Sequence, residues 1–263
     1  MKSHLGFVPW SLGALAFLLQ TQIRAGPTMV SPVAVIGTDL GTFSDATPLV
    51  NLINHSGIAD PFVSGTTSFD AYFASPRFSW ATNGAGSNWQ SDSSFKLPLT
   101  GYVDFDLGDR YMLNKFAIWN VSVENVVVRL AENPADLAHG LVAGEFVLTD
   151  HTSFVVYPVD ILDFGSVLPG RYVRFAIEST YPIQPGLTIA YAMMGEVVAS
   201  VIPPSIEIAR NANGSVTITF SGRLQSSARL DGHFEDVAGN PEGSYSLSPE
   251  ELSDQRYFRA SGD

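Results

Sequence analysis

Short segments in which every second residue is apolar constrain the fold of this chain most. In Val103–Leu107 the apolar side chains alternate with Asp104 and Asp106, which places the two kinds on opposite faces of a β-strand. Further apolar segments lie between Gly, Pro, Asn or Asp residues: Phe116–Trp119, Val126–Leu130, Glu145–Leu148, Phe154–Tyr157 and Tyr172–Ile177. Short strands separated by turn residues predict an all-β sandwich or barrel. Helical signals are few, and Leu49–Ile53 and Pro134–His139 are each long enough for a single turn.

A second, smaller unit is predicted after residue 204. The paired prolines of Val201–Pro204 cannot sit in a central strand and are typical of an extended linker. Beyond them, Ser205–Ile208 and Val216–Phe220 flank Asn213–Gly214, a dipeptide that favours the tight turn of a hairpin. We therefore expect a main domain at 26–200, a linker at 201–204 and a small β module at 205–263.

The first 25 residues have the features of an export signal. Lys2 precedes the apolar run Leu12–Leu19, and Ile23–Ala25 resembles a cleavage site. The alternative, a membrane anchor, would need about 20 apolar residues, and this run is much shorter. We expect 1–25 to be a signal peptide and the mature protein to be secreted or held on the exterior of the cell envelope, without a transmembrane anchor.

The chain is strongly acidic and contains no cysteine. It has 14 basic and 26 acidic residues, and loss of Lys2 and Arg24 with the signal would leave a net charge of −14. This charge repels phosphate backbones, which argues against a nucleic-acid partner, but it is compatible with bound calcium. Without cysteine, disulfides, thiolate metal sites and cysteine nucleophiles are excluded. These features fit a bacterial envelope or extracellular protein.

No catalytic motif is present. The sequence has five histidines, none of which lies in a Gly-x-Ser-x-Gly or His-Glu-x-x-His context. The many carboxylates offer no pair that the sequence selects for glycoside hydrolysis. We therefore expect no enzymatic activity. A pocket holding two titratable groups with strongly shifted pKa values would be the sign of an enzyme.

Motifs spread over residues 51–200 resemble the discoidin domain, or coagulation factor type C domain, a galactose-binding-like jelly roll. In order along the chain they are Ala81–Gly84, Asn88–Ser91, Val103–Gly108, Arg171–Phe175 and Gly195–Val197. They resemble the family's polar loop, tryptophan, Asp-Leu-Gly strand end, Arg-Tyr-Val-Arg strand and closing strand. The resemblance implies a jelly-roll β-sandwich. The tail, with Val216–Ser226, Gly232–Val237 and Arg256–Arg259, resembles a small C-terminal module of exported bacterial proteins.

The resemblance implies a calcium site beneath the ligand face. Its side-chain ligands in this chain are Asn83, Ser87 and Glu196, helped by backbone carbonyls, because calcium takes about six to eight oxygen ligands. Asn83 stands where the family usually has Asp, and Ala85 offers no side-chain oxygen, so the expected site is weakened. The alternative is a hydrogen-bonded turn, with Glu196 on a solvated strand end.

The resemblance also implies that loops at one end of the sandwich bind the ligand. The loop richest in aromatic residues runs from Phe69 to Trp80. The residues expected to stack on or hydrogen-bond a sugar are Tyr72, Arg77, Trp80 and Asn88. Alternatively, the aromatic residues here, among them Phe69, Phe73 and Trp89, are packing residues of the core.

Two functions of different classes follow from these features. The first is a non-enzymatic module that binds a glycan or another extracellular surface component. The second is a structural or adhesive protein of the envelope or matrix that binds another protein. The second would be favoured by an exposed apolar patch larger than roughly a few hundred Å² in place of a concave aromatic cleft.

Overall fold

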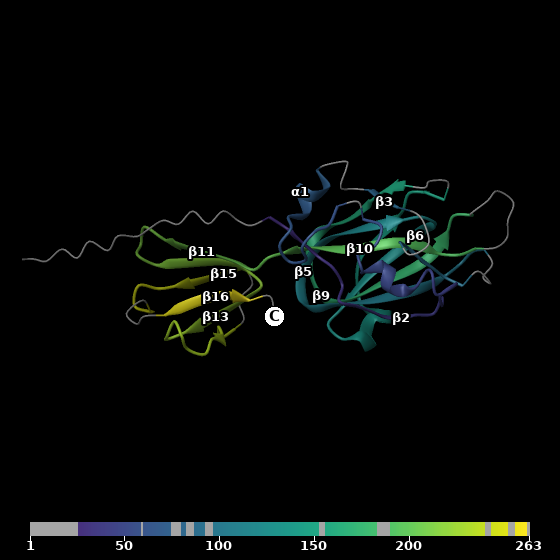
Figure 1. Cartoon of the computed structure of the whole chain (residues 1–263). Coiled ribbons are helices and arrows are strands. Elements are labelled where there is room, and N and C mark those ends of the chain that lie inside the picture. Colours follow the sequence, from purple (N-terminus) through teal and green to yellow (C-terminus); the bar gives the residue numbers. More distant parts are fainter. Residues whose placement is uncertain are drawn as a thin grey trace, which may run out of the picture.

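The computed structural model describes residues 26–58, 60–74, 80–82, 87–92, 97–152, 156–182, 190–239, 243–251 and 256–261. The expected signal peptide, 1–25, lies outside these ranges. Figure 1 shows a larger β unit followed by a smaller one that holds the C-terminal strands. Strands predominate in both units, so the predicted all-β fold class is confirmed.

Most strands of the larger unit belong to one antiparallel sheet in the order β1-β10-β5-β9-β6-β7, with β2 beside β5 and β4 beside β10. Their bounds are β1 (Thr28–Val30), β2 (Ala34–Thr38), β4 (Trp89–Gln90), β5 (Gly101–Asn120), β6 (Val123–Ala131), β7 (Leu141–Val147), β9 (Asp160–Thr180) and β10 (Met193–Ile202). A separate pair is formed by β3 (Trp80–Thr82) and β8 (Val156–Pro158).

Two long strands fold this sheet into a sandwich. The first part of β5 pairs with β2 and the last part of β9, whereas its second part pairs with β10 and the first part of β9. The register shifts between Asp106 and Tyr111, where Gly108 adopts φ +86°, a conformation that glycine reaches without a Cβ clash. The apolar segments at 103–107 and 116–119, predicted as two strands, are therefore halves of one bent strand that serves both layers (Figure 1).

The main core lies between the two layers of the sandwich. The rings of Phe105 and Phe116 each lie edge-to-face against Phe175, with centroids 5.4 Å apart. Other completely buried members of this core include Val103, Leu113, Ile118, Val128, Val173 and Val197. The alternation predicted for β5 and β9 is therefore confirmed, and the enclosed interior is that of a jelly-roll sandwich.

A second apolar cluster covers the outer side of β5 and β10. Phe69–Phe73, expected as a loop, forms the helix α1, and the hydroxyl of Ser68 caps it by accepting a hydrogen bond from the N–H of Ala71 at 3.4 Å. Phe69 is buried, and the ring of Phe73 packs on Trp119 of β5 with centroids 5.8 Å apart. These aromatic residues are therefore packing residues, as the alternative interpretation had it.

The C-terminal unit contains two three-stranded sheets. One is formed by β11 (Ser205–Arg210), β12 (Val216–Ser221) and β15 (Ser244–Leu247), and the other by β13 (Arg223–Ser227), β14 (Glu235–Asp236) and β16 (Tyr257–Ser261). β11 and β12 form the predicted hairpin. The unit has its own apolar core, built from Ile218, Phe220, Leu224, Val237 and Leu247. β10 extends to Ile202, so Pro203 and Pro204 alone separate it from β11.

Two short 3₁₀ helices, η1 (Leu49–Leu52) and η3 (Pro134–His139), confirm the predicted single turns of helix. No helix among the residues that the structure describes is long and apolar enough to cross a membrane.

Candidate functional site

Glu196 lies in a β-bulge of β10. Met194 pairs with Asn120 and Val197 pairs with Ile118, so β10 has one residue more than β5 between these two pairs. A bulge bends its strand and redirects the side chains on it. Here Glu196 is completely buried, so it does not occupy the solvated strand end that the sequence left open as an alternative.

The carboxyl group of Glu196 is poorly compensated. The backbone N–H groups of His55 and Ser56 face it, yet neither carboxyl oxygen reaches hydrogen-bond geometry with any residue that the structure describes. Burial raises the pKa of Glu196 to about 9, and the two N–H groups oppose this only in part. His55 has φ +61°, which is uncommon for a residue other than glycine, and successive N–H groups turned in this way suit a negatively charged group.

Two further buried oxygens in this region lack hydrogen-bond partners among the described residues: the hydroxyls of Ser56 and Tyr157. Burial, and to a smaller extent the charge of Glu196, raises the pKa of Tyr157. Buried polar groups in native proteins are nearly always paired, so several orphaned oxygens together indicate a place for a bound ion or water. Glu196 and Tyr157 are both completely buried.

Ser87 belongs to the same region. Ser87 precedes Trp89 by two residues, and Trp89 pairs with Met194, which precedes Glu196 by two residues. The amide of Asn51 donates to the carbonyl of Asn88 at 3.0 Å, which ties η1 to this segment. Ser87 is buried.

The described residues of this region fit calcium in donor type, because a carboxylate and hydroxyl groups are the oxygen ligands that calcium takes. The third expected ligand, Asn83, lies outside the described residues. Within the ranges given above, no group of three or more His, Cys, Asp or Glu side chains could hold a metal. Glu196 would therefore be the one acidic side chain among the named ligands.

The structure places two of the expected sugar-binding residues in the interior. Tyr72 is 6% exposed, its hydroxyl donates to the carbonyl of Asp60 at 2.7 Å, and its ring packs edge-on against Phe62. Asn88 is 1% exposed. Both residues therefore pack inside the protein. Arg77 and the side chain of Trp80 lie outside the described residues.

Phe43 is the exposed aromatic residue of the loops. It lies between β2 and η1, and its side chain is 54% exposed. No other phenylalanine, tyrosine or tryptophan in the described part of the chain is as exposed. The sequence did not single out Phe43, although it lies in the polar, turn-like context Gly-Thr-Phe-Ser-Asp.

The loop that carries Phe43 is fixed to the sandwich. The indole N–H of the buried Trp89 donates to the carbonyl of Gly41 at 3.1 Å, and the N–H of Phe43 donates to the carbonyl of Gln90 at 2.9 Å. Leu40 is buried in the main core. A loop held in this way by a rigid scaffold can present a side chain in a defined position.

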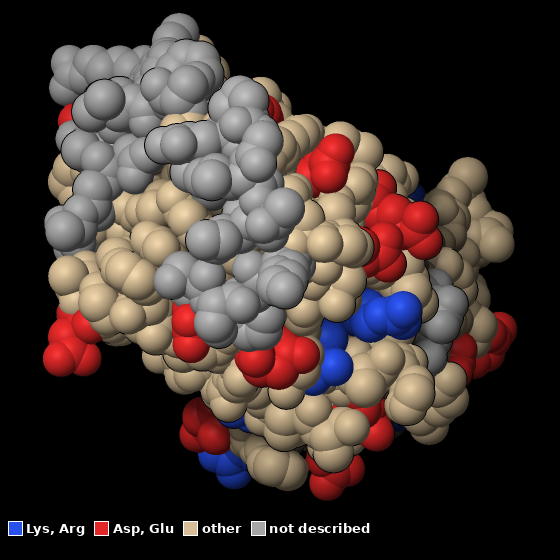
Figure 2. Space-filling view, turned by 90° about the vertical axis from the view of Figure 1, so that its right-hand side faces the viewer, with Lys and Arg blue, Asp and Glu red and all other residues tan. Residues whose placement is uncertain are grey.

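Two exposed carboxylates lie close to this loop. Asp45 is exposed two residues after Phe43 in the chain, and Asp92 is exposed two residues after β4. Figure 2 views the end of the larger unit that lies away from the C-terminal strands, and it shows acidic side chains scattered among uncharged ones, with few basic side chains. The described loop therefore combines one exposed ring with nearby carboxylates.

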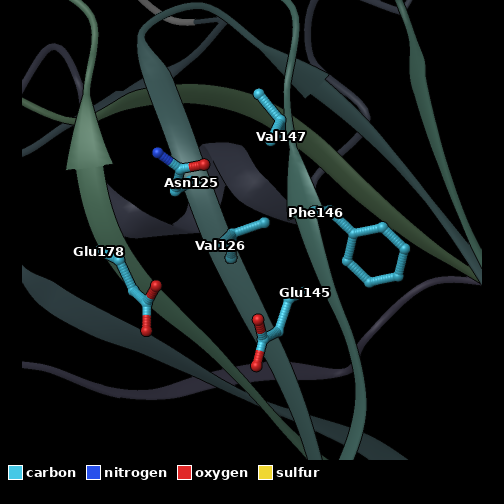
Figure 3. Close-up of a pocket in the computed structure, with 6 residues that line it drawn as sticks. All are labelled: Asn125, Val126, Glu145, Phe146, Val147 and Glu178. Carbon is cyan, nitrogen blue, oxygen red and sulfur yellow. The ribbon is translucent and has the colours of Figure 1, made fainter.

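A shallow cleft of about 240 Å³ lies over β6, β7 and β9. Its lining residues are Asn125, Val126, Glu145, Phe146, Val147 and Glu178 (Figure 3). Phe146 packs against the main core, so the cleft offers two carboxylates and the exposed Val147 but no free aromatic face.

No family model and no curated protein sequence matches this chain. Among solved structures, a fragment of a candidate chitobiase from Bacteroides thetaiotaomicron is 17% identical, with a TM-score of 0.45, over 70% of this chain and 98% of that chain. The family 32 carbohydrate-binding module of Clostridium perfringens NanJ, solved with galactose, is 12% identical (TM-score 0.41), over 66% of this chain and 98% of that chain. A chitosan-binding module from Paenibacillus sp. IK-5 is 10% identical (TM-score 0.39), over 67% and 96%.

Proposed function

We propose that this chain is a non-catalytic module that binds a carbohydrate through the loop between β2 and η1, with Phe43 as the stacking surface. The observation that carries the proposal is the exposure of this one ring. The other described phenylalanine, tyrosine and tryptophan side chains are buried or partly buried, whereas Phe43 is 54% exposed on a loop fixed by Trp89. An exposed ring on a fixed loop provides an apolar face at a low cost in conformational entropy.

The neighbouring polar groups favour a neutral sugar. Asp45 and Asp92 are exposed, and ionised carboxylates accept hydrogen bonds from hydroxyl groups. The same carboxylates would repel a uronate or a sulfated sugar at this loop.

We also propose a structural calcium ion at Glu196, with Ser87, Asn83 and backbone carbonyls as further ligands. The orphaned oxygens of Glu196 and the buried hydroxyl of Ser56 support it. A cation there would compensate the buried carboxylate and stiffen the segment that leads from Ser87 through Trp89 to the Phe43 loop. Residues 1–25 support export of the protein, which would place it where calcium is plentiful.

A protein partner, the second function considered, would be favoured by one continuous apolar surface. The exposed apolar side chains of the described residues lie on several elements: Ile36 on β2, Ile208 on β11 and, on β7, Leu141, Val142 and Val147. This distribution favours the carbohydrate proposal.

The proposal is tested with the complete mature chain on a glycan array and in pull-downs with insoluble polysaccharides. We expect retention by at least one neutral glycan and loss of that retention in Phe43→Ala. A protein that binds no glycan, no polysaccharide and no cell-wall fraction would refute it.

A further inference from the structure

Three arginines lie on the outer face of the layer formed by β2, β5, β9, β6 and β7. Arg171 and Arg174 belong to β9, and Arg129 lies on the neighbouring strand β6. Arg129 and Arg174 point away from the core because they alternate with the core residues Val128, Leu130, Val173 and Phe175. Arg171, which is in phase with Val173, is assigned to this face by its ion pair with Asp106. We refer to Arg129, Arg171 and Arg174 as the arginine face.

Two of these arginines are neutralised within the fold. Arg174 donates two hydrogen bonds of 2.7 Å to the carboxylate of Asp104 and stacks over the ring of Tyr102, 3.8 Å from its centroid. Arg171 donates to both oxygens of Asp106 at 3.0 and 3.1 Å. Paired carboxylates of this kind hold the guanidinium groups in fixed positions.

Arg129 differs from its neighbours. Its one hydrogen bond within the described residues is a long contact of 3.4 Å to the carbonyl of Gly140. The other basic side chains described in the jelly roll all lie within 4.0 Å of a carboxylate: Arg110, Lys115, Arg171 and Arg174. In a chain with 26 acidic residues against 14 basic ones, an arginine without a carboxylate is the exception.

The position of Arg129 opposite another arginine is expected to lower the stability of the sheet. Arg129 lies directly opposite Arg174 in the register of β6 and β9, and like charges at directly opposed positions destabilise a sheet. On its other side the register partner is Val142 of β7, which supplies no charge. Features that cost stability without a visible structural return are found preferentially at functional sites.

We propose that the arginine face binds an anionic group of a polysaccharide, a carboxylate or a sulfate, with Arg129 as its principal contact. A guanidinium group has five donors in a planar fork that matches such oxyanions. Arg129 uses one of these donors at most. Asp109 and Asp39 act on Arg171 and Arg174 in addition to their paired aspartates, so the positive charge of the arginine face that lacks a carboxylate is that of Arg129.

The acidity of the whole chain does not prevent this binding. At physiological ionic strength the screening length is about 8 Å, so charges farther away contribute little to the interaction at Arg129. Glu145 and Glu178 lie on the same outer face at the cleft of Figure 3. Glu145 lies opposite Val127, two residues from Arg129 on β6, so the cleft side of this face would repel an anionic chain.

The experiment is affinity electrophoresis of the mature chain through gels that contain polygalacturonate, dextran sulfate or neutral dextran. We expect retardation by one or both anionic polymers and none by dextran. Stronger retardation by polygalacturonate would assign a carboxylate, and stronger retardation by dextran sulfate a sulfate.

Arg129→Gln should weaken the retardation about tenfold, because it removes the charged hydrogen bonds to the ligand. Arg129→Lys should restore part of it, since the charge returns without the fork. Lys115→Gln is the matched control, because it removes a charge whose partner is Asp163, on the other layer of the sandwich. Phe43→Ala should leave the retardation unchanged, which separates this surface from the proposed sugar-binding loop.

Melting curves of each variant show whether it is folded. The proposal would be overturned if neither anionic polymer slowed the wild-type chain, if Arg129→Gln migrated like the wild type, or if Lys115→Gln lost as much retardation as Arg129→Gln.

Discussion

The indole N–H of Trp89 donates a hydrogen bond to the backbone carbonyl of Gly41 at 3.1 Å, and this contact joins the buried core to the exposed loop that carries Phe43. Trp89 is completely buried, and the carbonyl it binds is only two residues from the exposed ring. The side chain that a ligand would meet is thus held in place by a residue that no ligand can reach.

Replacing Trp89 should therefore loosen the loop. Trp89→Phe keeps an aromatic ring but removes the N–H donor and part of the buried volume, which together should cost about 2 kcal/mol of stability. For a chain of this size the melting temperature should fall by about 4–8 °C. Glycan affinity should fall several-fold, because the loop must then be ordered on binding. Calorimetric titration and thermal melting measure the two effects.

Glu196 offers a test of the proposed calcium ion. At a calcium concentration 100 times the dissociation constant, a single site would stabilise the fold by about 2.7 kcal/mol. We expect the wild-type melting temperature to rise with calcium and to fall again with a chelator. Glu196→Gln should remain folded, because it places a neutral group of the same size in the buried position, but should lose the response to calcium. An equal response in both proteins would contradict the assignment.

Tyr72→Phe separates packing from ligand binding in α1. The substitution keeps the ring against Phe62 but removes the hydroxyl that donates to Asp60, so it takes this donor from a partly buried carbonyl. The cost should be about 1 kcal/mol, or about 2–4 °C in melting temperature. Glycan binding should not change. A large loss of binding without a change in stability would instead assign Tyr72 to the ligand.

The ion pair of Arg171 and Asp106 predicts a pH-dependent contribution to stability. Hydrogen bonds from Arg171 lower the pKa of Asp106, partial burial opposes this, and the N–H of Gly108 lowers it further. A carboxyl whose pKa is lowered by folding stabilises the fold above its unfolded pKa of about 3.9, and this contribution is lost as the pH falls through the folded value. Arg171→Gln should therefore melt slightly below the wild type at pH 7, and the difference should shrink as the pH falls through the lowered pKa of Asp106 in the folded protein. Melting curves across this range would check it, and a constant difference would contradict it.

The sequence predicted the parts of the fold that depend on local pattern. The alternation of Val103–Leu107 and the hairpin at Asn213–Gly214 are both local, and both are present. The joining of two apolar segments into one bent β5 depends on pairing with β2, β9 and β10, which are distant in the sequence. The helix Phe69–Phe73 was missed because five residues show no helical period, although Ser68 three residues before Ala71 was a capping signal.

The candidate site was less predictable. The resemblance named Glu196, but its burial results from the register shift against β5, which is a property of strand pairing. The exposure of Phe43 likewise depends on contacts with Trp89 and Gln90, residues far along the chain. An aromatic residue in a loop can be core or surface, and only its tertiary surroundings decide which.

The most direct test of the central claim is the affinity of wild type and Phe43→Ala for a glycan that the array identifies, measured by calorimetric titration. Loss of a stacking ring at the centre of a binding site typically costs about 2 kcal/mol or more, so affinity should fall about 30-fold or more. The melting temperature should stay unchanged, because the ring is 54% exposed. Val63→Ala, which shortens an apolar side chain 63% exposed elsewhere on the surface, is the control and should bind like the wild type. If Phe43→Ala binds the glycan as tightly as the wild type does, the Phe43 loop is not the binding site.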